Sequence, residues 1–172
     1  VMETLEEKLP KSANPHVRER LSEQKQEEQE HIELWERFAF ALGITKEELE
    51  KYEPTETVME AVYSIVEQAE KGFDEGIAAM YAFECDLPAI SQTKIDGLIN
   101  FYGMKSDDAH AYFNEHLKEE QHLCFWRELL KNVTPRKQAS ALSAAKATVE
   151  AQNKVLDGVV ERYCPQLCGC AA

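Results

Sequence analysis

The sequence predicts an all-α protein folded as a bundle of about six or seven helices. Apolar residues recur with helical spacing along most of the chain, and the seven glycines and six prolines fall between these periodic stretches. No stretch alternates β-branched and polar residues as a strand would. With 172 residues, the chain has the length of one domain and can bury a substantial core. We therefore expect a single bundle over residues 1–163 and a separate tail over residues 164–172.

The first half of the chain supplies four expected helices. After an acidic opening segment that ends at Pro10, they cover residues 15–42, 45–53, 55–72 and 73–87. The second begins with a capping box, in which Thr45 and Glu48 each satisfy the other's backbone N–H group. The fourth is apolar on nearly every face, so it should be buried. Glu84, near its end, is therefore a candidate buried carboxylate.

The second half supplies three more helices. One follows Pro88 and runs to Gly103, and Ser106 caps another, which carries the residues from His116 to Trp126. The last helix begins at Thr134-Pro135. Its apolar stripe, which should face the core, consists of Leu142, Ala145, Val149, Leu156 and Val160.

The net charge of −13 excludes two classes of partner. Nucleic acids and anionic membrane surfaces attract proteins through clustered Lys and Arg, which do not dominate here. No apolar run approaches the roughly 20 residues needed to cross a bilayer, and the first ten residues do not resemble a secretory signal. We therefore expect a soluble, cytoplasmic protein.

Five cysteines are present, three of them in the tail. Cys164, Cys168 and Cys170 could form a disulfide or hold a soft metal, but no histidine accompanies them, so we expect a reduced, frayed tail. Cys85 and Cys124 are expected to pack as small apolar side chains in the core.

Two Glu-x-x-His pairs are the main functional signal. Glu28 precedes His31 and Glu119 precedes His122 by three residues, which places both members of each pair on one helix face. Together with Glu84 they are the ligand set of a two-metal site in a helical bundle, suited to iron or manganese. Because 32 of the 172 residues are acidic, such pairs also arise by chance. The third carboxylate favours a metal site, since buried carboxylates rarely occur without a partner.

Four segments of the chain resemble one protein family. Residues 31–54 (HIELWERFAFALGITKEELEKYEP), 76–90 (GIAAMYAFECDLPAI), 94–103 (KIDGLINFYG) and 112–116 (YFNEH) are similar to the haem-oxygenase-like di-metal oxidases. Within that family the likeness is to the chlamydial proteins that associate with death domains and to their bacterial relatives, which act as 4-aminobenzoate synthases. The resemblance implies an up-and-down helical bundle with the metals between its core helices. It also places further helices of the family before residue 1.

The resemblance implies a ligand set. The family uses a Glu seven residues before a His, then a lone Glu, then a His-x3-Asp-x2-His run. Four of these positions fall on His31, Glu84, His116 and His122. Gln24 stands where the first Glu would be. The nearby carboxylates are Glu23, Glu27 and Glu28, of which Glu28 belongs to the Glu-x-x-His pair.

The second ligand segment leaves alternatives open. His116 and His122 are six residues apart, one fewer than in the family, so the family's Asp corresponds to Glu119 or Glu120. On a regular helix, residues six apart diverge by about 120°. Either the helix is distorted so that His116 joins Glu119 and His122, which we favour, or Glu115 takes the place of His116.

The resemblance also implies the chemistry. It predicts an oxygen-dependent enzyme with two metal ions, iron or iron with manganese, and with dioxygen as co-substrate. The resembled synthases make 4-aminobenzoate, a folate precursor, from their own side chains: a tyrosine is excised and a lysine supplies the amino group. Lys94 matches the place of that lysine. A small molecule is the other candidate substrate, and a homodimer is the candidate assembly.

Three other functions compete with this interpretation. A metal-free enzyme of cofactor metabolism on the same fold, like the thiamin-salvage and PQQ-synthesis relatives, could use Cys85 as a nucleophile, but the clustered His and Glu argue against it. A death-domain binding module is compatible with the acidic surface, although no motif encodes a partner. A ferritin-like store shares the Glu-x-x-His pattern, but the HIELW and YFNEH segments argue against it.

Overall fold

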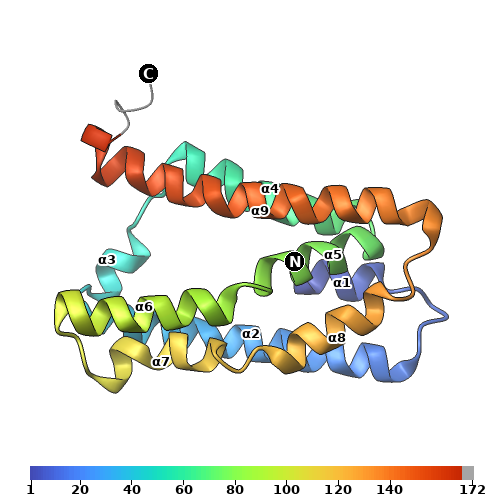
Figure 1. Ribbon diagram of the computed structural model, residues 1–172, viewed down its shortest axis with the longest axis horizontal. Helices are drawn as coiled ribbons and strands as arrows, with labels where there is room; N and C mark the ends of the chain where they lie inside the picture. Colours follow the sequence, from blue (N-terminus) through green and yellow to red (C-terminus); the bar gives the residue numbers. More distant parts are fainter. Residues whose placement is uncertain (168–172) are drawn as a thin grey trace.

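The computed structural model describes residues 1–167, and every regular element in that range is helical (Figure 1). Seven helices have ten residues or more: α2 (Pro15–Ala41), α4 (Glu56–Lys71), α5 (Phe73–Glu84), α6 (Leu87–Tyr102), α7 (Asp107–His116), α8 (Glu120–Leu130) and α9 (Pro135–Tyr163). Shorter elements are α1 (Met2–Lys8), α3 (Lys46–Glu50) and a 3₁₀ turn, η1 (Pro165–Leu167). The predicted all-α class is confirmed. Cys168 and Cys170 of the predicted tail lie outside the described residues.

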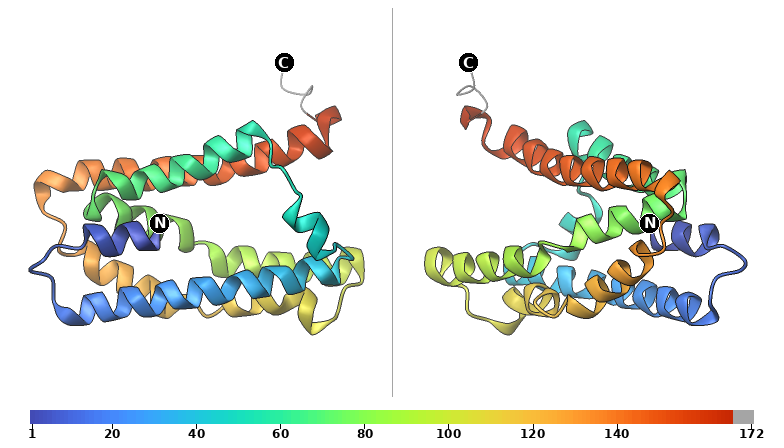
Figure 2. Two further views of the ribbon diagram at one scale, coloured as in Figure 1. Left: turned by 180° about the vertical axis from the view of Figure 1, so that it is seen from behind. Right: turned by 45° about the vertical axis from the view of Figure 1, so that its right-hand side comes forward.

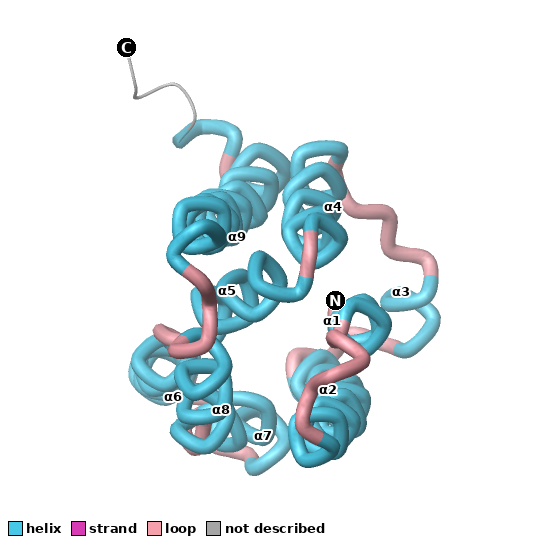
Figure 3. The backbone as a smooth tube through the Cα atoms, turned by 90° about the vertical axis from the view of Figure 1, so that its right-hand side faces the viewer, coloured by secondary structure: helices cyan, strands magenta, loops and turns pink. Residues whose placement is uncertain are grey.

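The helices form two layers with α5 between them. The end-on view in Figure 3 shows α4 and α9 side by side in one layer and α2, α6, α7 and α8 in the other, and the views in Figure 2 agree. Helix α5 packs against α4, α8 and α9, whereas α2 packs against α7. Glu84, the last residue of α5, therefore lies in the interior of the bundle. Within residues 1–167, no helix is long and apolar enough to cross a membrane.

The main hydrophobic core lies where α1, α2, α5 and α8 meet. Leu5, Leu21, Ile77 and Trp126 are its largest fully buried side chains, one from each of these helices. Our expectation of a merely acidic segment before Pro10 was therefore incomplete. The segment forms α1, and its apolar residues supply one wall of the core.

The last helix packs with small residues, contrary to the predicted stripe. Its buried positions are Ala141, Ala144, Thr148, Ala151 and Gly158, whereas Leu142, Val149 and Leu156 of the predicted stripe are exposed. Close approach to α4 explains the preference. A Cβ atom on Gly158 would lie 2.7 Å from Val58 Cγ2, which is closer than van der Waals contact allows. Helical period alone could not separate this small-residue face from the larger apolar one.

The helix expected from Ser106 through residue 126 is broken. Ser106 caps α7 as predicted, with its Oγ accepting the Ala109 N–H at 3.3 Å. Helix α7 nevertheless ends at His116, a turn covers residues 117–119, and α8 starts at Glu120. The break separates His116 from the Glu119–His122 pair, which decides how these three ligands can meet.

Candidate metal centre

Six predicted ligands come from four different parts of the bundle. Helix α2 supplies Glu28 and His31, α5 supplies Glu84, α7 supplies His116, and the turn before α8 and α8 itself supply Glu119 and His122. One ligand atom from each of Glu84, Glu119 and His122 lies within 4.8 Å of the others. The His31 and His116 rings have centroids 4.6 Å apart. The structure thus brings residues distant in sequence into one cluster, in which all but Glu28 and His122 are buried.

Glu84 is a buried carboxyl group held by a tryptophan. Only 3% of the residue is exposed, and the Trp126 indole Nε1–H donates to its Oε2 at 2.7 Å. Burial raises the pKa of Glu84 to about 8, although the Trp126 hydrogen bond opposes that change, and the charge of Glu119 raises the pKa further. Near neutral pH without a cation, Glu84 therefore holds a proton that a cation would displace.

The turn between α7 and α8 places Glu119 between two imidazoles. Glu119 is 4% exposed; its Oε2 lies 2.9 Å from His122 Nδ1 and its Oε1 lies 3.6 Å from His116 Nε2. Glu120, the alternative, is exposed and pairs with Arg127, and Glu115 is exposed and pairs with Lys118. The distorted arrangement that we favoured, with His116, Glu119 and His122 together, is the one that the structure shows.

The two imidazoles of this segment have different partners. His116 Nδ1–H donates to the Tyr112 carbonyl at 2.8 Å, so Nε2, which faces Glu119, is the ring nitrogen that can bind a cation. His122 Nε2 lies 2.7 Å from Glu27 Oε2 on α2. The Glu119 carboxylate, followed by Glu27, raises the pKa of His122 to about 9. Glu27 was named only as a nearby carboxylate, because its contact crosses between helices and leaves no spacing signal.

On α2 the predicted Glu-x-x-His pair forms a contact of its own. His31 is buried, and its Nδ1 lies 3.4 Å from Oε2 of the half-buried Glu28. This carboxylate raises the pKa of His31. Burial alone would raise the pKa of Glu28, but the proximity of His31 and the charges of His116 and His122 outweigh it, so the pKa of Glu28 is lowered. Glu28 is therefore ionised and available to a cation.

Buried polar atoms without a hydrogen-bond partner concentrate around the candidate metal centre. Among the described residues, five buried side-chain N or O atoms have no hydrogen-bond partner: Gln24 Oε1, Gln24 Nε2, His31 Nδ1, Glu119 Oε2 and Glu75 Oε2. The short contacts of His31 and Glu119 described above do not have hydrogen-bond geometry. Buried polar groups are nearly always satisfied in folded proteins. Three of these four side chains lie on α2 or beside His122, which fits a cation ligated there.

A groove leads from the surface to this cluster. It is lined by residues of α2 and of the α7–α8 segment, among them Glu27, His31, Glu119 and His122. Lys94 does not join the cluster: it is exposed on α6 and forms no ion pair or hydrogen bond with other described side chains. The structure therefore does not test the role predicted for Lys94.

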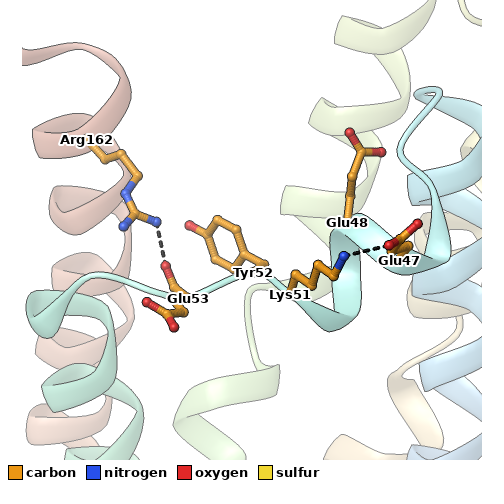
Figure 4. A pocket seen from close by; sticks show the side chains of 6 residues that line it. All are labelled: Glu47, Glu48, Lys51, Tyr52, Glu53 and Arg162. Carbon is orange, nitrogen blue, oxygen red and sulfur yellow. Dashed lines mark hydrogen bonds and ion pairs between the residues drawn. The ribbon is translucent and has the colours of Figure 1, made fainter.

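A second hollow is separate from the cluster. Figure 4 shows it between α3 and the end of α9, where it is lined by Glu47, Glu48, Lys51, Tyr52, Glu53 and Arg162. Arg162 Nη1 donates to the Glu53 carbonyl at 2.6 Å, and Lys51 Nζ lies 2.5 Å from Glu47 Oε1. The two cationic groups of the hollow are thus each held by a partner within it.

Cys85 and Cys124 were both expected in the core. Cys85 is half-buried, and burial followed by the charge of Asp86 raises the pKa of its thiol. Thiolate is the reactive form, so this environment disfavours reactivity. Cys124 is exposed, which contradicts the predicted core position. It sits on the outer face of the amphipathic helix α8, whose buried face carries Leu123 and Trp126.

Comparison with known proteins identifies similar sequences. The model of the TENA/THI-4/PQQC family matches residues 8–162. A relative from Nitrosomonas europaea named 4-aminobenzoate synthase is 35% identical over 162 residues, covering 91% of this chain and 65% of the relative. Relatives of the same name from Chlamydia muridarum and Chlamydia trachomatis are 31% and 40% identical over 133 and 87 residues. These cover 76% and 50% of this chain, and 56% and 38% of the relatives. The chain thus spans less than two thirds of the length of the relatives it matches.

Proposed function

The chain belongs to the TENA/THI-4/PQQC family, and on that premise we propose that it acts as an oxygen-dependent di-metal oxidase that forms 4-aminobenzoate. The single observation that carries this proposal is the convergence of His31, Glu84, His116, Glu119 and His122, of which all but His122 are buried. The name shared by the similar proteins supports the product. The donor set supports the metals, because carboxylates and imidazoles in a helical bundle suit iron and manganese.

The six proposed ligands are of two chemical kinds. Glu28, Glu84 and Glu119 supply carboxylates, and His31, His116 and His122 supply imidazoles. When bound, two reduced ions, iron or iron with manganese, supply the electrons that activate dioxygen. Glu84 gives up its proton on binding, while Trp126 keeps hold of one of its oxygens and fixes its direction. His116 is held in the tautomer that offers Nε2 by its bond to the Tyr112 carbonyl.

The substrate in this proposal is a side chain of the protein itself, with a small molecule as the alternative. Lys94 is the proposed amino donor, and its exposure on α6 leaves its ammonium group unpaired with any other described side chain. An unpaired lysine can change position without losing an ion pair, so no ion pair has to break before Lys94 moves.

Anaerobic reconstitution tests the proposal. The full chain is loaded with Fe²⁺, alone or with Mn²⁺, and exposed to oxygen, and 4-aminobenzoate and the intact mass of the chain are measured by mass spectrometry. We expect metal bound at the cluster, product, and mass loss from the chain. His122→Ala should abolish all three, and His16→Ala, which changes an exposed histidine on α2, should abolish none. A metal-loaded protein that gives neither product nor mass loss would contradict the proposal.

The same samples separate the rival functions. Full activity of protein stripped of iron and manganese would favour the metal-free enzymes of the family. A protein partner whose binding survives His31→Ala and Glu84→Ala would favour a binding module. Uptake of many iron ions per chain without product would favour a store.

A further inference from the structure

Gln24 is the one described residue whose side chain is buried with both of its polar atoms unpartnered. It is 2% exposed, and neither Oε1 nor Nε2 has a hydrogen-bond partner. Burial of an amide without partners costs about 1–3 kcal/mol in proteins. Such a group calls for a ligand that the amide binds.

The position of Gln24 indicates which ligand this is. Gln24 precedes Glu28 by four residues and His31 by seven, so all three lie within an arc of about 60° on the inner face of α2. One turn before it, Leu21 packs in the core that contains Trp126, whose indole donates to Glu84. Gln24 therefore lies on α2 between the hydrophobic core and the two α2 residues of the candidate metal centre.

We propose that the carbonyl oxygen of Gln24 is a neutral ligand of this metal centre. The inference rests on the proposed function, because it assumes that the centre binds metal. Amide carbonyl oxygens, like carboxylates, suit hard divalent ions such as Mn²⁺. The ligation supplies the partner that Oε1 lacks and leaves the Nε2 donors for a neighbouring carboxylate or water.

A neutral ligand at this position has a consequence for charge. Glu28, Glu84 and Glu119 contribute three negative charges, against four positive charges on two divalent ions, so the loaded centre keeps one net positive charge. A carboxylate in place of Gln24 would cancel it. Gln24→Glu should therefore bind divalent ions more tightly than the wild type, whereas Gln24→Leu should bind them more weakly.

The chain provides a matched control in Gln68. This residue is also 2% exposed, on α4, but its amide is satisfied: Nε2 donates to the Ser64 carbonyl at 2.7 Å and Oε1 accepts from Lys71 Nζ at 2.6 Å. Gln68→Leu removes an amide that has hydrogen-bond partners, whereas Gln24→Leu removes an amide that has none. Without metal, Gln24→Leu should raise the melting temperature, and Gln68→Leu should lower it.

The experiment measures Mn²⁺ affinity and melting temperature on the same purified chains. Titration calorimetry of the wild type, Gln24→Leu, Gln24→Glu, Gln68→Leu and His122→Ala gives the affinities, and thermal unfolding in chelator gives the stability of the metal-free forms. We expect Gln24→Leu to weaken Mn²⁺ binding about tenfold or more while melting higher. Gln24→Glu should tighten binding by a similar factor, and Gln68→Leu should leave it unchanged.

The outcomes distinguish this inference from the proposed function. If the wild type binds Mn²⁺ and His122→Ala does not, but Gln24→Leu binds as tightly as the wild type, then Gln24 is not a ligand and the metal centre stands without it. If the wild type does not bind Mn²⁺ at all, both the inference and the proposed centre are wrong. Weaker Mn²⁺ binding by Gln24→Leu together with a higher melting temperature supports the ligand role. Loss of a merely structural amide would not lower the Mn²⁺ affinity while raising the melting temperature.

Discussion

Replacing Glu84 by Gln should make the stability of the metal-free protein less dependent on pH. In the unfolded chain the carboxyl group loses its proton near its ordinary pKa of 4.5, whereas burial keeps it protonated in the folded protein up to about pH 8. The folded state therefore binds a proton that the unfolded state lacks. The resulting stabilisation is fully present below pH 4.5 and is lost as the pH rises through about 8.

The size of the effect follows from those two values. Each pKa unit corresponds to about 1.4 kcal/mol, so the wild type should lose about 4 kcal/mol between pH 5 and pH 9 through this group. The amide introduced by Glu84→Gln does not titrate, keeps nearly the same shape, and can still accept the Trp126 N–H through its carbonyl oxygen. The variant should therefore match the wild type near pH 5 and exceed its free energy of unfolding at pH 9.

Urea denaturation in chelator at pH 5, 7 and 9 measures this difference, with Glu75→Gln as the control. Glu75 is also buried, but Ser140 and Lys137 bind it at 2.6 and 3.0 Å and lower its pKa despite burial. A lowered pKa gives stability that is present throughout pH 5–9, so Glu75→Gln should cost the same at each pH. If the free energies of unfolding of the wild type and Glu84→Gln differ by the same amount at pH 5 and at pH 9, the reasoning is refuted.

Three further changes have definite expected outcomes. Mn²⁺ affinity, measured calorimetrically, should rise with pH by about tenfold per unit for each proton that Mn²⁺ displaces, one from Glu84 up to about pH 8 and one from His122 up to about pH 9. An affinity that does not change with pH would contradict this. Gly158→Ala should destabilise the chain by about 1–3 kcal/mol in urea, because its Cβ would meet Val58 Cγ2 at 2.7 Å. Gly97→Ala, whose nearest neighbour lies 3.9 Å away, should stabilise it by up to about 1 kcal/mol. Lys94→Met should retain fold and metal but lose 4-aminobenzoate, whereas Lys105→Met should keep the product; product from Lys94→Met would remove that lysine from the reaction.

The helical class and most element boundaries could be predicted from local signals. The capping box of Thr45 and Glu48 and the cap at Ser106 are contacts within three residues, so the sequence alone specifies them. The end of α7 at His116 has no such signal. It depends on burying both His116 and Glu119, which no uninterrupted helix could do together with His122.

The site could be predicted only as far as its residues share a helix face. Glu28 with His31 and Glu119 with His122 follow from spacing, whereas the bond from Trp126 to Glu84 and the contact of Glu27 with His122 join different helices. The buried face of α9 was missed for a related reason. Its buried residues are small because α4 lies close to it, and a pattern of hydrophobicity does not show how close two helices approach.

In this account His31, Glu84, His116, Glu119 and His122 bind metal ions inside the bundle. Anomalous X-ray diffraction at the manganese edge, from crystals of the full chain soaked in Mn²⁺, tests it most directly. We predict anomalous peaks within about 2.0–2.4 Å of the Glu84 and Glu119 oxygens and of a His122 ring nitrogen. Crystals that show no peak among these side chains at a saturating concentration of Mn²⁺ would contradict the claim.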